Sequence, residues 1–151
     1  MFHELNEINS MEKEKKSELK ELAAKNFSVW NQSLLSRDAH EVASLYDQDA
    51  SFLPTLNSGF KHGQDGAEKY FKHFLEKNPA GKIIEEAIQE TSVNKNGNIS
   101  SFLHSGMYNF EIGEQNNRQI VEARFTFLWQ KDEAGDWKIK HHHSSLKPLE
   151  K

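Results

Sequence analysis

Apolar residues in the first part of the chain recur at helical spacing. From about Glu14 they fall three or four residues apart, at Leu19, Leu22, Ala23, Phe27, Trp30 and Leu34. This spacing predicts one long amphipathic helix over residues 14–36. Residues 1–13 are polar and show no such pattern, so they are expected to form a flexible leader before a single domain over residues 14–151.

Two shorter helices are predicted to follow, each starting with an aspartate that precedes a glutamate by three residues. Asp38 with Glu41 opens the first of them, and Asp65 with Glu68 opens the second. An acidic cap followed by an acidic third residue is typical of a helix N-terminus. Between the two helices, residues 50–53 predict a short strand that Pro54 ends.

After Gly81 the apolar pattern changes to the alternation of β-strands. Polar turns separate four long strands, and Asn96-Gly97 is typical of a tight hairpin turn. The expected strands cover residues 83–93, 99–112, 120–130 and 137–145. Three helices followed by a meander of antiparallel strands predict an α+β domain with its helices on one face of the sheet.

Strict alternation sorts the strand side chains into an inner and an outer face. In the last strand it places Trp137, Ile139, His141, His143 and Ser145 on the inner face, and Lys138, Lys140, His142 and Ser144 on the outer one. In the preceding strand the better core face is Val121, Ala123, Phe125, Phe127 and Trp129. In the strand before that, the inner face is Phe102, His104, Gly106, Tyr108, Phe110 and Ile112.

The inward polar residues predict a half-polar cavity beneath the helix that carries Trp30. His104, Tyr108, His141 and His143 would line this cavity if the strands bring them together. Under the alternative interpretation, each histidine forms its own hydrogen bond in the core or at a strand end. The order of the residues leaves both interpretations open.

Composition and charge remove several classes of function. The chain has 151 residues, a net charge of −4 and no cysteine. The absence of cysteine excludes disulfides, zinc-thiolate sites and thiol catalysis. A mildly acidic chain has no general attraction for nucleic acid or anionic lipid. With neither a secretion signal nor a long apolar stretch, we expect a cytoplasmic protein that does not bind membranes.

The order of these motifs resembles the cone-shaped nuclear transport factor 2-like superfamily. Within it, the chain is most similar to the association (hub) domain of calcium/calmodulin-dependent protein kinase II and its stand-alone bacterial relatives. The resemblance covers about residues 15–148. The segments that carry it are Leu34–Tyr46, Phe52–Thr55, Gly63, Tyr70–Leu75, Ser105–Phe110, Ala123–Trp129 and Trp137–Ser145.

The resemblance implies a curved sheet with three helices on its concave face, and a deep pocket between helices and sheet. It also implies self-assembly through the sheet into dimers or larger rings. In the kinase hub, arginines of the sheet line the pocket, whereas the matching positions here hold His104 and Phe127. The self-association surface would be the outer sheet face: Glu122, Arg124, Thr126, Lys140 and His142. A β-bulge would instead turn Arg124 inward.

The same fold hosts ketosteroid isomerases and polyketide cyclases, so the fold alone does not assign an activity. The base of the isomerases lies on the short strand after the second helix, but no acid follows Asp49 there. The cyclase carboxylate lies near the final strands, and residues 137–145 hold no acid. The enzymatic alternative is therefore a histidine site, with His104 or His143 as the base and Tyr108 as a hydrogen-bond donor.

His141 and His143 would project to one side of their strand, as a pair of metal ligands can, but no third ligand is evident nearby. We therefore expect no metal and no cofactor. The favoured interpretation is a non-catalytic homo-oligomeric association domain, a dimer or larger, whose cone can take a small molecule.

Overall fold

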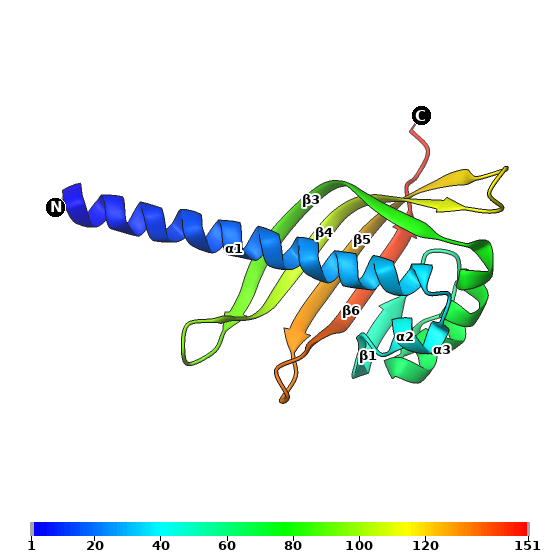
Figure 1. The fold of residues 1–151 in the computed structure, drawn as a ribbon, viewed down its shortest axis with the longest axis horizontal. Helices are drawn as coiled ribbons and strands as arrows, with labels where there is room; N and C mark the ends of the chain where they lie inside the picture. Colours follow the sequence, from blue (N-terminus) through cyan, green and yellow to red (C-terminus); the bar gives the residue numbers. More distant parts are fainter. Residues whose placement is uncertain (1, 151) are drawn as a thin grey trace.

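The computed structural model describes residues 2–150, which form three α-helices, one short 3-10 helix and six strands (Figure 1). The helices are α1 (Phe2–Leu35), α2 (Ala39–Ala43) and α3 (Gly63–Phe74), and the 3-10 helix η1 is Leu75–Lys77. The strands are β1 (Tyr46–Leu53), β2 (Lys61–His62), β3 (Ala80–Val93), β4 (Ile99–Ile112), β5 (Gln119–Lys131) and β6 (Trp137–Leu146).

The strands form one curved sheet in the order β2-β1-β6-β5-β4-β3, and the sheet does not close on itself. Strands β3 to β6 pair as an antiparallel meander, while β6 also pairs in parallel with β1. Figure 1 shows α1 crossing the sheet and α3 lying beside β1 on the same side. The predicted α+β fold, with its helices on the concave face, is confirmed.

The first helix is longer than the sequence predicts. It begins at Phe2 rather than at Glu14, so residues 2–13 are helical. Side chains 2–18 are nevertheless exposed, and the inward face begins at Leu19 and ends at Leu34. The exposed half therefore depends on helical propensity and on one ion pair with the sheet, from Lys15 to Glu90, whereas tertiary packing holds the second half. Among residues 2–150, no helix is both long and apolar enough to cross a bilayer.

One of the two predicted helix caps is confirmed and the other is wrong. Asp38 caps α2, and its carboxylate accepts hydrogen bonds from the backbone N–H groups of His40 and Glu41. Helix α3 begins two residues before Asp65, at Gly63, which has a φ of +64°. A Cβ at Gly63 would lie 2.6 Å from the Gln48 carbonyl oxygen, so the helix start depends on glycine here.

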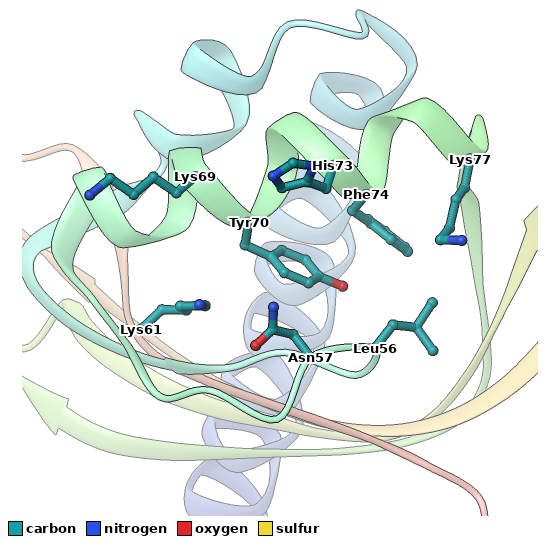
Figure 2. Close-up of a pocket in the computed structure, with 8 residues that line it drawn as sticks. All are labelled: Leu56, Asn57, Lys61, Lys69, Tyr70, His73, Phe74 and Lys77. Atoms are coloured by element: carbon teal, nitrogen blue, oxygen red, sulfur yellow. The ribbon is translucent and has the colours of Figure 1, made fainter.

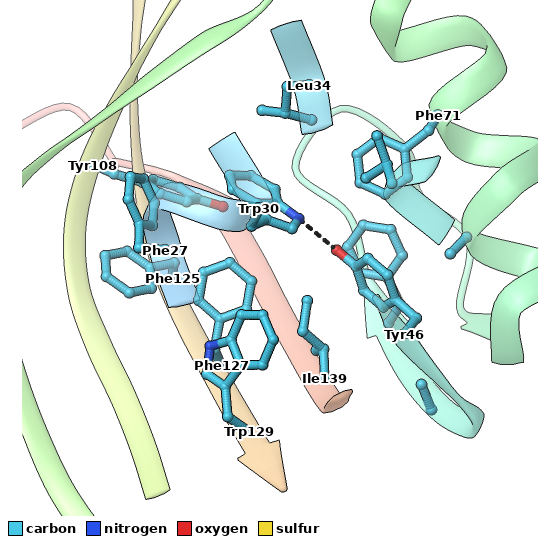
Figure 3. Packing of buried hydrophobic residues seen from close by; sticks show 14 of the residues in the cluster. Phe27, Trp30, Leu34, Tyr46, Phe71, Tyr108, Phe125, Phe127, Trp129 and Ile139 are labelled. Carbon is cyan, nitrogen blue, oxygen red and sulfur yellow. Dashed lines mark hydrogen bonds between the residues drawn. The ribbon is translucent and has the colours of Figure 1, made fainter. Parts of the chain in front are cut away.

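Aromatic rings fill the space between the helices and the sheet (Figure 3). Trp30 is the central residue of this core, with only 1% of its surface exposed. Its ring lies 5.3 Å from that of Phe127 and 6.3 Å from that of Tyr108. The inward positions predicted for β4 and β5 are largely confirmed, because Phe102, His104, Tyr108, Phe110, Ala123, Phe125, Phe127 and Trp129 are all buried.

The predicted orientation of the three consecutive histidines is wrong. His142 is buried in the core, whereas His141 is half-buried and His143 is exposed. The cause is a bulge at Lys140. One step along β5, from Trp129 to Leu128, is opposed by two steps along β6, from Ile139 to His141. An extra residue in a strand exchanges the two faces for everything that follows it.

Candidate functional site

His142 lies at the centre of the cone. Its imidazole is stacked between two phenylalanine rings, with centroid distances of 4.8 Å to Phe52 and 4.1 Å to Phe127. The indole of Trp30 meets it edge-on at 5.6 Å. Strands β1, β5 and β6 and helix α1 therefore all contribute to one aromatic cage around a polar ring.

Both nitrogens of the imidazole have hydrogen-bond partners. The Tyr46 hydroxyl lies 2.8 Å from Nδ1 of His142, and the Tyr108 hydroxyl lies 3.3 Å from Nε2. Tyr108 in turn donates to Ser144 Oγ, and Ser144 shares a hydrogen bond with Thr55 Oγ1. These contacts connect the core to Thr55, a half-buried residue next to Pro54.

The indole of Trp30 sets the direction of the protons in this network. Its Nε1–H can only donate, and it donates to the Tyr46 hydroxyl oxygen over 3.2 Å (Figure 3). The Tyr46 proton is then directed at Nδ1 of His142, so the neutral imidazole carries its own proton on Nε2 and donates it to Tyr108. Every polar group of this buried network has a partner, which is the condition for burying polar groups without a large cost.

Burial controls the protonation of these groups. It lowers the pKa of His142 well below the ordinary value, and the charges of His141 and His143 lower it further. Burial also raises the pKa of Tyr46 and of Tyr108. The network is therefore neutral near pH 7, with histidine as imidazole and both tyrosines as phenols.

The cone leaves little open space above this network. A cleft of about 10 Å³ lies among Trp30, Phe52, Thr55, Tyr70, Phe71, Phe74, Tyr108, Phe110, His142 and Ser144. That volume is close to the smallest that can hold one water molecule. The rings of helix α3 fill most of the pocket that the sequence predicts.

The structure brings together only part of the predicted pocket set. Trp30 and Tyr108 line the cleft, while Phe127 is buried behind His142. His141 and His143 lie on the opposite face of the sheet, where His141 Nδ1 is 2.6 Å from Ser51 Oγ. The buried hydrogen-bond network instead contains Tyr46, Thr55, His142 and Ser144, which sequence reasoning missed because the bulge at Lys140 has no local sequence signal.

His104 lies apart from this network. Its Nε2 atom is 3.3 Å from the Glu86 carboxylate, and Phe125 meets the ring edge-on at 5.1 Å. Burial lowers the pKa of His104, although Glu86 opposes that shift. The proposed acid/base set of His104, Tyr108 and His143 is thus not assembled in one place. Within residues 2–150, no three histidine or carboxylate side chains gather in a way that could hold a metal ion.

The outer face of the sheet carries no helix among residues 2–150. Glu122, Arg124 and Thr126 project from it as predicted, so Arg124 does not point into the cone. Lys140 lies at the bulge, with its amine 3.2 Å from the Asp47 carboxylate. His142 belongs to the core and cannot contribute to this surface. Because of the bulge, His143 takes the place on the outer face that was predicted for His142.

Cross-strand rows of residues, all half-buried except the exposed His143, run over the middle of the outer face. One row is Leu103, Leu128, His141 and Ser51, and the next is Ser105, Thr126, His143 and Leu53. Beside them, a hollow of about 270 Å³ lies between Glu85, Ala87, Met107 and Arg124. The face therefore combines apolar side chains, a projecting cation and a recess with a carboxylate.

Another depression, larger than the cleft of the cone, lies between helix α3 and the loop after β1. Its volume is about 300 Å³, and Figure 2 shows its lining: Leu56, Asn57, Lys61, Lys69, Tyr70, His73, Phe74 and Lys77. We call it the basic groove. Tyr70 and Phe74 line both the basic groove and the cleft of the cone, so these two rings separate the two spaces.

Several solved structures share this architecture. A nuclear transport factor 2-like superfamily protein from Salmonella enterica serovar Typhimurium aligns with a TM-score of 0.68 and 19% identity, covering 89% of this chain and 94% of that one. A protein of the same family from Streptomyces avermitilis that is named a dehydratase aligns with a TM-score of 0.69 and 12% identity, covering 89% and 99%. At these identities, the likeness shows that this chain has the nuclear transport factor 2-like fold.

The sequence itself identifies the family within this fold. Residues 18–148 match the family described as calcium/calmodulin dependent protein kinase II association domain. A structure from Xanthomonas campestris that carries the same family name is 33% identical, with a TM-score of 0.74, covering 83% of this chain and 86% of that one. No curated protein matches this chain in sequence. The chain belongs to the calcium/calmodulin-dependent protein kinase II association domain family.

Proposed function

We propose that this protein is a homo-oligomeric association domain that pairs with a second copy through the outer face of its sheet. The observation that carries the proposal is the composition of that face. Leu103 and Leu128 lie side by side at its middle, where no helix of residues 2–150 covers them. Membership of an association-domain family supports the same conclusion.

The charges on this face suit a contact between identical copies. Arg124 is exposed, and its guanidinium makes one long hydrogen bond, of 3.3 Å, to Ser145 Oγ. The adjacent hollow offers the carboxylate of Glu85. In a two-fold symmetric pair each copy presents the same patch, so a cation and an anionic recess on one face can complement those of the partner.

The oligomeric state tests this proposal. Gel filtration coupled to light scattering should give at least twice the 17.5 kDa chain mass at micromolar concentration. Leu128→Arg places a charge in the middle of the face and should lower the mass to that of one chain. Val93→Arg introduces the same charge at an exposed position near the β3–β4 turn and should leave the assembly intact. A wild-type chain that stays monomeric would remove the proposal.

The cone itself is a proposed second element of function, as a pocket for a small molecule. Thr55 and Ser144 supply hydroxyls at its floor, and the rings of Tyr70 and Phe74 cover it. Since only about 10 Å³ is open, a ligand larger than water requires one of those rings to move. Soaking crystals with xenon tests whether the cleft opens, and self-association through the sheet does not depend on the answer.

A further inference from the structure

The basic groove gathers positive charge without matching negative charge. Its lining contains three lysines and a histidine, namely Lys61, Lys69, His73 and Lys77, and no acidic residue. Within residues 2–150 none of the three lysine amines forms an ion pair, whereas Lys15 and Lys140 each pair with a carboxylate. In a chain with a net charge of −4, such a group of free cations is a local exception. An anion is the complement that this arrangement lacks.

A neutral hydrogen-bond donor lies among these cations. The Asn57 side-chain oxygen accepts a 2.7 Å hydrogen bond from the backbone N–H of Gly59, which leaves its amide nitrogen to point into the groove (Figure 2). Gly59 also brings Lys61 close. A Cβ built on this glycine would lie 2.9 Å from Asn57 Oδ1 and 3.1 Å from Lys61 Nζ. The loop therefore places an ammonium and an amide side by side.

The opposite wall of the groove is aromatic. Tyr70 and Phe74 are 7% and 5% exposed, and their rings stack with a centroid distance of 5.5 Å and an interplanar angle of 23°. Figure 2 shows the Tyr70 ring directly above Asn57. A groove of about 300 Å³ with one apolar wall and a few convergent donors has the composition of a small-molecule site.

We propose that the basic groove binds a small aromatic acid, with its carboxylate or phosphate on Lys61 and Asn57 and its ring against Tyr70. Lys69 and Lys77 also line the groove, from helix α3 and η1, and add to its positive potential. Lys69 and His73 are four residues apart and so lie on the same face of α3, and Lys77 follows in η1. This binding is separate from self-association, because the groove and the outer sheet face share no residue.

Nuclear magnetic resonance titration tests the proposal on the full chain. Phenylacetate and phenyl phosphate are the probes, benzyl alcohol is the neutral analogue and inorganic phosphate is the anion without a ring. Amide shifts should concentrate at residues 56–61 and 69–77. Both aromatic acids should bind at least tenfold more tightly than benzyl alcohol or inorganic phosphate, and their affinity should fall as ionic strength rises. The stronger of the two acids identifies whether the head group is a carboxylate or a phosphate.

Matched variants locate the site. Lys61→Gln should weaken binding about tenfold, since it removes a charge-assisted hydrogen bond. Lys95→Gln removes the same charge at the exposed β3–β4 turn and should leave the affinity unchanged. Gly59→Ala keeps every charge but puts a methyl group between Asn57 and Lys61, and should also weaken binding.

Three results would overturn the proposal. The first is an equal loss of affinity in Lys61→Gln and Lys95→Gln, and the second is a set of amide shifts that maps outside the groove. The third is no saturable binding of either acid at 10 mM, since a site of millimolar affinity, which corresponds to ~4 kcal/mol, would be largely filled at that concentration. Thermal unfolding and light scattering of each variant accompany the titrations. A variant that loses acid binding but keeps the wild-type oligomeric mass would show that this site is independent of the contact through the sheet.

Discussion

Tyr46 and His142, from the two strands that pair in parallel, share a buried hydrogen bond of 2.8 Å between the tyrosine hydroxyl and Nδ1 of the imidazole. The two residues are 96 positions apart in the chain. This contact requires the parallel pairing of β1 with β6, which brings the two strands together. It also requires the bulge at Lys140, because without the extra residue His142 would lie on the other face of the sheet.

Tyr46→Phe should destabilise the fold by about 1–3 kcal/mol. The substitution leaves the Trp30 indole N–H without an acceptor and the His142 Nδ1 without a donor, and both atoms are buried. The measurement is the free energy of unfolding in urea. Tyr70→Phe removes a tyrosine hydroxyl at the edge of the basic groove, outside the network, and should cost less stability than Tyr46→Phe. Equal losses of unfolding free energy would contradict the role of the network.

The stability should fall with acidification below about pH 6.5. Burial lowers the pKa of His142 below its ordinary value of 6.5, so the unfolded chain takes up a proton there while the folded chain does not. Stability is therefore complete above that pH and declines by up to about 1.4 kcal/mol per pH unit as the pH falls toward the lowered pKa.

Urea unfolding between pH 5 and pH 7.5 measures this dependence. His142→Asn should make the pH profile flatter over that range, whatever its effect on overall stability. His3→Gln is the control, because it removes an exposed histidine whose charge does not act on His142, and it should keep the wild-type slope. Parallel profiles for the wild type and His142→Asn would sink the assignment.

Deleting Lys140 should prevent cooperative folding. Without the extra residue, strict alternation would turn His142 outward and direct His141 and His143 into the aromatic core. Lys140→Ala keeps the bulge and loses only the partly exposed contact with Asp47, at a cost of at most about 1 kcal/mol. Circular dichroism and urea unfolding compare the two variants, and a deletion variant as stable as Lys140→Ala would show that the bulge does not set the face.

Gly106→Ala should destabilise the fold by more than about 3 kcal/mol. A Cβ at Gly106 would lie 1.9 Å from the Glu85 carbonyl oxygen, where the register between β3 and β4 shifts past Ile84. Gly97→Ala is the comparison, because that turn glycine has open space around it and only its φ of +81° resists the change. The cost at Gly97 should be about 1–2 kcal/mol. Equal melting temperatures for the two variants would contradict this prediction.

Local chemistry allowed the elements to be predicted from the sequence. The cap at Asp38, the end of α1 near residue 36 and the four long strands follow from spacing and turn residues. The hairpin turns follow in the same way, since Asn94 and Asp132 each accept two backbone N–H groups across a loop that contains a glycine with positive φ. The basic groove was not predicted, although Lys69, His73 and Lys77 recur every four residues.

The sequence by itself determined the fold class, the aromatic core and the family, because all three depend on periodicity and on the order of motifs. Only the tertiary structure decided which histidine is buried, since a bulge at Lys140 exchanges the two faces of β6 and nothing in the run Lys140–Ser144 distinguishes them. The groove likewise needed the loop fold that places Lys61 opposite helix α3. Alternation predicts a side chain's face within a regular strand, but the register with its neighbours determines where that strand stops being regular.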